Sequence, residues 1–97
     1  MIGVNKESLT YQQKLTYPMI RYIRLCRNLT QERFGEVCRI DQSVLAKLER
    51  GEIELTVNYE GRILHGCQSL KISEMELDSI TKLLELNKEI TRRGQET

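Results

Sequence analysis

The sequence predicts an all-α fold, in which a compact five-helix domain carries an extended C-terminal helix. The chain has 97 residues, 39% of them hydrophobic and one of them proline, which suffices for a single domain with its own core. Only 5% of the residues are aromatic, and no alternating run rich in Val, Ile and Thr indicates a strand. Apolar residues instead recur at helical spacing along successive segments.

The first predicted helix follows a polar N-terminal arm over residues 1–16. Thr16 and Pro18 have the spacing of an N-cap and a first-turn proline, so we expect a helix from residue 17 to about residue 27. Its inward side chains are expected to be Ile20, Ile23 and Leu25.

The segment from Thr30 to Gly51 contains two short amphipathic helices that meet at a tight turn. Thr30 is an N-cap residue type. The buried stripe expected after it is Phe34, Val37 and Cys38. Asp41 is suited to cap the second helix, and Gly51 is suited to end it. The inward side chains of this second helix are expected to be Val44, Leu45 and Leu48.

The outer face of the second helix is polar. It carries Gln42, Ser43, Ala46, Lys47 and Arg50. An amide, a hydroxyl, a small side chain and two cations are poorly suited to burial in protein and well suited to the major groove of DNA. Taken alone, the same pattern also fits a solvated helix face, so the residues by themselves leave both interpretations open.

A fourth helix is expected from about residue 56 to residue 70. Its apolar stripe is Tyr59, Ile63, Cys67 and Leu70. A long last helix then begins with the Ser-x-x-Glu spacing of a capping box at Ser73 and Glu76. Its stripe is Leu77, Ile80, Leu83, Leu84, Asn87 and Ile90. This stripe fits either the domain's own core or a dimer seam, and because the helix runs to about residue 93 we expect it to dimerise, with Asn87 setting the register.

Composition limits the other classes of protein. The formal net charge of +1 neither supports nor excludes a nucleic-acid partner. Cys26, Cys38 and Cys67 lack CxxC spacing and a nearby His. We therefore expect buried thiols in a reducing cytoplasm, without disulfides or zinc. No run approaches the roughly 18 apolar residues of a membrane span.

The sequence contains no catalytic constellation that would indicate an enzyme, and no cofactor motif or set of metal ligands. His65 is the single histidine, and no second ligand lies near it in the sequence. We interpret it as an exposed or capping residue.

Residues 20–72 resemble the lambda-repressor-like (Cro-type) helix-turn-helix family. The residues that carry the resemblance are Ile20, Ile23, Arg24, Leu29, Thr30, Gln31, Phe34, Leu45, Leu48, Glu49, Arg50 and Gly51. Two positions depart from the family pattern. Gly35 is the small residue inside the first helix of the motif, and Arg39 stands where the family has its turn glycine.

The resemblance implies a role for each polar residue of the motif. Gln31, with Thr30 before it, would meet a phosphate at a helix N-terminus. The expected base readers are Gln42 and Ser43, with Ala46 and Lys47 further along the same face. Arg50 would contact the DNA backbone. Arg39, which departs from the family, is either a solvated turn residue or a further phosphate contact. Arg24 and Glu49 would form an ion pair that holds two helices in register.

These interpretations together predict a DNA-binding regulator. Residues 17–72 would form the helix-turn-helix domain, and residues 73–97 would form the dimerisation element. We expect a repressor that binds double-stranded DNA at a pseudo-palindromic operator as a homodimer. The alternative is a protein-interaction module, antitoxin-like or regulator-binding, that uses the C-terminal helix to hold a protein partner.

Overall fold

The computed structural model describes residues 15–96, with side-chain environments as far as residue 87. Its helices are α2 (Tyr17–Cys26), α3 (Gln31–Cys38), α4 (Gln42–Arg50), α5 (Val57–Ser69) and α6 (Glu74–Glu96). Within residues 15–96 there is no strand, so the all-α prediction is confirmed. The predictions for most of the N-terminal arm and for the side chain of Ile90 lie outside the described residues.

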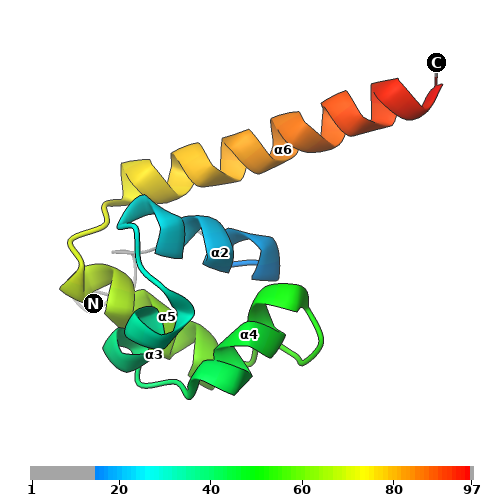
Figure 1. Ribbon diagram of the computed structural model, residues 1–97. Helices are drawn as coiled ribbons and strands as arrows, with labels where there is room; N and C mark the ends of the chain where they lie inside the picture. The colour runs from blue at the N-terminus through cyan, green and yellow to red at the C-terminus, as the bar shows by residue number, and fades with distance from the viewer. Residues whose placement is uncertain (1–14, 97) are drawn as a thin grey trace, which may run out of the picture.

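The four shorter helices form a compact body, and α6 lies across one side of it (Figure 1). The first half of α6 packs on α2, whereas its second half runs past the body and carries the C-terminus away from it. Helices α3 and α4 sit at the opposite side of the body from α6, with α5 behind α3.

Side-chain caps begin most of these helices where the sequence predicts them. The hydroxyl of Thr30 accepts a hydrogen bond from Arg33 N at 3.1 Å, and the hydroxyl of Thr56 accepts one from Tyr59 N at 3.2 Å. Ser73 and Glu76 form the reciprocal bonds of a capping box. Because caps satisfy backbone N–H groups within one turn, they set helix boundaries from local sequence alone.

The core lies where α2, α3, α4, α5 and the start of α6 meet. Its fully buried side chains are Met19, Ile20, Ile23, Phe34, Cys38, Leu45, Leu48, Ile63, Cys67, Ile72 and Leu77. Burial raises the pKa of the Cys38 thiol to about 12 and that of Cys67 to about 11. Both thiols therefore behave as the small hydrophobes that were expected.

Some inward-facing predictions are wrong. Leu25 is 46% exposed, because it follows Ile23 by two residues and so points to the other side of α2. Cys26, the last residue of α2, is exposed rather than buried. The side chains that are half-buried rather than buried are Val37, Val44, Tyr59 and Leu70.

The first half of α6 belongs to the compact body. Leu77 is fully buried and Ile80 is 6% exposed, both in the shared core, and Leu84 packs against that core. The dimer role expected for Leu77 and Ile80 is corrected here, because these two side chains are used inside the chain itself. Leu83 is 47% exposed, and Asn87 is exposed.

An ion pair holds the start of α6 against the end of α2. The guanidinium of Arg27 donates to both carboxylate oxygens of Glu76, at 2.9 and 3.0 Å, and to the carbonyl of Leu70 at 3.1 Å. The bonds from Arg27 lower the pKa of the Glu76 carboxyl to about 2. The Arg27–Glu76 pair therefore stabilises the folded state fully above pH 4.5, the ordinary pKa of a glutamate, and this stabilisation is lost as the pH falls toward 2.

Two close backbone features set the angle between α3 and α4. Arg39 ends α3 in the left-handed conformation, with φ 60° and ψ 43°, where a side chain costs roughly 1 kcal/mol relative to glycine. Gly35 approaches the turn so closely that a Cβ atom there would lie 2.6 Å from the carbonyl oxygen of Ile40. Gly35 is therefore required because there is no room for a side chain, and not because of its backbone angles.

We expect Gly35→Ala to lower the free energy of unfolding by about 1 to 3 kcal/mol, because the new methyl group must push the α3–α4 turn aside. Gly61→Ala is the matched control, since a Cβ atom at Gly61 meets nothing within 4 Å. That control should gain up to about 1 kcal/mol from helix propensity. Urea unfolding of both variants measures the difference, and equal or higher stability for Gly35→Ala would contradict the close approach.

Candidate nucleic-acid interface

Helix α4 presents one polar face to solvent. Leu45 and Leu48 are fully buried on its inner side. The exposed residues on its outer side are Gln42, Ser43, Lys47 and Arg50, with Ala46 half-buried between them. The structure therefore brings the predicted base-contacting residues together on one accessible helix face.

The N-terminus of α4 is organised by Asp41. Its carboxylate accepts a hydrogen bond from Ser43 N at 3.1 Å and another from the Ser43 hydroxyl at 2.5 Å. These bonds lower the pKa of the Asp41 carboxyl below its ordinary value. Because the Ser43 hydroxyl already donates to Asp41, its lone pairs are what it presents outward, and it is suited to accept a hydrogen bond from a base.

This influence of Asp41 on Ser43 was missed at the sequence level, where Asp41 was interpreted as a helix cap alone. The Asp-x-Ser spacing at the N-cap could have indicated it. An aspartate readily accepts a hydrogen bond from the residue two positions further on.

A buried network joins α4 to α2 and α3. Arg24 donates from Nε to Glu49 Oε2 at 2.8 Å and from Nη2 to Glu49 Oε1 at 3.1 Å. The other terminal nitrogen of Arg24, Nη1, donates to the carbonyl oxygen of Leu29 at 3.0 Å. The side chains are only 14% and 5% exposed, so this bidentate pair holds α4 in a defined position on α2.

Gln31 takes part in the same network. Its amide nitrogen donates to Glu49 Oε1 at 3.1 Å. One N–H of the amide is therefore engaged within the protein, and one remains for an outside acceptor. Gln31 stands at the first position of α3, where the free backbone N–H groups also point outward.

The two cations of α4 differ in whether they already have an ion-pair partner. Arg50 is paired with Glu52 at 2.6 Å, and both side chains are more than half exposed. Such an exposed pair is weak and can be exchanged for a phosphate at little cost. Lys47 is exposed and forms no ion pair with any residue in the described part of the chain.

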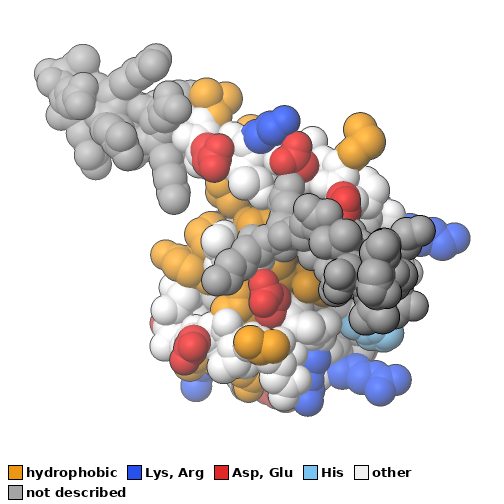
Figure 2. Space-filling model, turned by 180° about the vertical axis from the view of Figure 1, so that it is seen from behind, with side chains coloured by type: hydrophobic (Ala, Val, Ile, Leu, Met, Phe, Trp, Pro, Cys, Tyr) orange, Lys and Arg blue, Asp and Glu red, His pale blue; other side chains and the backbone are white. Residues whose placement is uncertain are grey.

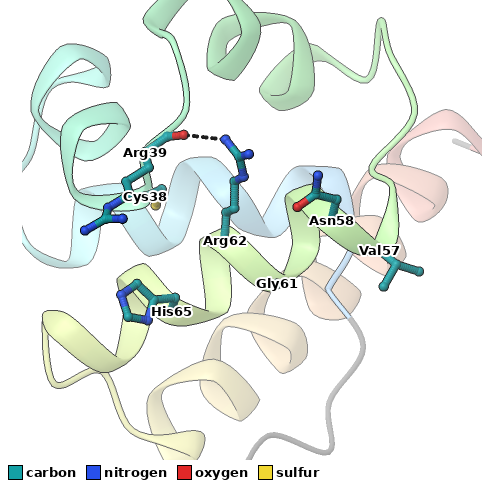
Figure 3. A pocket seen from close by; sticks show the side chains of 7 residues that line it. All are labelled: Cys38, Arg39, Val57, Asn58, Gly61, Arg62 and His65. Atoms are coloured by element: carbon teal, nitrogen blue, oxygen red, sulfur yellow. Dashed lines mark hydrogen bonds between the residues drawn. The ribbon is translucent and has the colours of Figure 1, made fainter.

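A pocket of about 460 Å³ lies between the α3–α4 turn and α5. Arg62 Nη1 donates to the backbone carbonyl of Arg39 at 2.7 Å, whereas the Arg39 side chain points away from Arg62, and His65 lies further along α5 (Figure 3). Asn58 and Gly61 complete the α5 side. Sequence reasoning did not find Arg62, because its partner lies 23 residues away and no local pattern links them.

Two other classes of site were searched for among the described residues. No group of three or more His, Cys, Asp and Glu side chains in that range could hold a metal ion. In the same range, no helix combines the length and the apolar character that crossing a membrane requires.

Comparison with protein families finds one match. Residues 20–59 match the family model described as Helix-turn-helix. The matched segment includes the α3–α4 pair and the residues of the Glu49 network, and it ends within the first turn of α5. No curated protein and no solved structure matches the chain.

We expect Glu49→Gln to lower the free energy of unfolding by about 3 to 5 kcal/mol, because it leaves the buried guanidinium of Arg24 without an opposite charge. Glu52→Gln removes the same charge from an exposed pair and should cost less than about 1 kcal/mol. Urea unfolding of both variants provides the comparison. Similar losses for the two would show that the Arg24–Glu49 pair is no better coupled than a surface pair.

Proposed function

We propose that the protein is a repressor that binds a pseudo-palindromic operator as a homodimer, because residues 20–59 match the helix-turn-helix family model and resemble the lambda-repressor-like family. Helix α4 is its recognition helix. The observation that carries this proposal is the polar outer face of α4, which stays accessible while Glu49 anchors the helix to α2 and α3. A rigid helix is needed to place side chains against base edges.

The geometry favours distinct roles along α4. The Gln42 amide is suited to bond N6 and N7 of an adenine, and Ser43 is suited to accept from a base amino group. Lys47, one turn further on, is suited to a guanine or a phosphate. The residues proposed to contact the DNA backbone are Thr30, Gln31, Arg39 and Arg50.

We expect Gln42→Ala to weaken binding to a DNA site selected by the wild-type protein by about 5- to 150-fold, the range of one lost bidentate base contact. Binding to unrelated DNA should be unchanged, because that binding depends on phosphates. Gln68→Ala removes an exposed amide from α5 and serves as the control. Fluorescence anisotropy with both duplexes tests this, and a wild-type protein without any sequence preference would refute the DNA-binding proposal.

Homodimer formation is proposed through the exposed side of α6. Met75, Leu83 and Leu86 are 80%, 47% and 54% exposed. Their spacing of eight and three residues places them along one stripe, distinct from the buried face that carries Leu77. A homodimer that binds two half-sites must place its recognition helices about 34 Å apart, one turn of DNA. Figure 1 shows that α6 reaches beyond the body, where a partner helix can approach it.

We expect the wild-type protein to dimerise with rising concentration in sedimentation equilibrium, and a Leu83→Glu and Leu86→Glu double variant to remain monomeric, because two buried carboxylates oppose the apolar contact. Val57→Glu adds a charge at a site that is 86% exposed on α5 and should still dimerise. A truncation that tests α6 must follow Leu84, because a cut before Ser73 would remove core residues.

A second candidate function is a protein-interaction module of the antitoxin-like or regulator-binding kind. It is favoured by an apolar groove of about 450 Å³ along the same stripe, where Cys26 from α2 meets Met75, Ile80 and Leu83 of α6. A wild-type protein that is monomeric at all concentrations would exclude the homodimer and leave this groove to a different protein.

A further inference from the structure

We propose that the pocket between the α3–α4 turn and α5 binds a backbone phosphate of DNA, through Arg39, Arg62 and His65. This inference rests on the proposed DNA-binding function and extends it. It adds α5 to a contact surface that the helix-turn-helix pair alone would otherwise supply.

The first argument is the chemistry of the lining. Among residues 15–96 the pocket is lined by Cys38, Arg39, Val57, Asn58, Gly61, Arg62 and His65, and none of these is a carboxylate. Two guanidinium groups, an imidazole and an amide all offer N–H donors, which match the oxygens of a phosphate diester. None of the ion pairs found in the described residues involves Arg39 or Arg62.

The second argument is preorganisation. The bond of 2.7 Å from Arg62 Nη1 to the Arg39 carbonyl holds the guanidinium at the mouth of the pocket. Of the five N–H groups on that guanidinium, one is used there and four remain. An arginine loses less conformational entropy for each new hydrogen bond when its planar guanidinium is already oriented.

The third argument is position. Arg39 lies two residues before Asp41, the N-cap of α4. A helix that enters the major groove by its N-terminus brings the preceding turn close to a flanking strand. Figure 2 shows basic side chains gathered at the side of the body away from α6, near the histidine, whereas most of the acidic side chains in that view lie elsewhere. The pocket thus borders the turn that leads into α4.

This proposal also gives the left-handed Arg39 a reason. The glycine expected at this position would remove the backbone strain of the left-handed conformation. It would also remove one of the two guanidinium groups from the pocket. A phosphate contact offsets that strain in the complex, because hydrogen bonds to charged groups are stronger than those between neutral groups.

The test compares Arg62→Gln with Lys71→Gln. Lys71 is an exposed residue in the α5–α6 turn, so both variants lose one positive charge. We expect Arg62→Gln to bind selected and unrelated duplexes about tenfold more weakly, by the same factor for each. The slope of log affinity against log salt should become shallower by about 0.9, one phosphate contact. Lys71→Gln should leave both quantities unchanged.

A neutral methylphosphonate placed at successive positions of the duplex locates the contact. At one position it should weaken the wild-type protein and have no further effect on Arg62→Gln. Arg62→Lys retains the charge and should keep the salt slope, which separates loss of the contact from loss of folding.

Wild-type preference for a selected site together with an unchanged slope in Arg62→Gln would overturn this inference alone, whereas absence of any preference would refute the proposed function. A free-anion site is a distinct outcome. Inorganic phosphate at constant ionic strength would then shift the His65 resonances in the wild type and not in Arg62→Gln, while the DNA salt slopes stayed equal, and this result would also overturn the proposal.

Discussion

The carboxylate of Glu49 is the point on which the arrangement of the helices depends. It accepts two hydrogen bonds from Arg24 on α2 and one from Gln31 on α3, and it stands on α4 itself. Three helices are therefore joined through one almost fully buried group. A buried ion pair of this kind contributes little net stability against an apolar replacement. The pair instead fixes the orientation of α4. Apolar packing by Leu45 and Leu48 tolerates small rotations of α4, whereas a bidentate pair does not.

The close backbone contact between α3 and the turn adds a second restriction. Gly35 lets the carbonyl of Ile40 approach α3, and Arg39 turns the chain through the left-handed region. The network positions the C-terminal half of α4, and this contact positions its start. Gln42 and Lys47, on the exposed face of α4, take no part in either restraint. Substitution of Gln42 or Lys47 should therefore leave the packing of α4 on α2 and α3 unchanged.

Local patterns predicted the helices well, because caps and periodicity act within one or two turns. Thr30, Asp41 and the Ser73–Glu76 box mark helix starts that the structure retains. Periodicity could not reveal which neighbour covers a stripe, so Leu77 and Ile80 were grouped with the exposed Leu83. The long-range bonds of Arg62 to Arg39 and of Arg27 to Glu76 were also missed, since they depend on how helices pack. The family pattern, by contrast, predicted the ion pair between Arg24 and Glu49.

The contact of α5 with α3 has a consequence for the thiol chemistry of the protein. A Cβ atom at Gly66 would lie 2.5 Å from the Cys38 sulfur, so the two helices touch there without any gap. A thiol reagent can reach Cys26 on the folded protein, but it reaches the buried Cys38 and Cys67 only when the helices that cover them separate. The three cysteines should therefore differ in their rate of reaction with a thiol reagent. The first reacts at the rate of the reagent, and the other two react at the rate at which the domain opens.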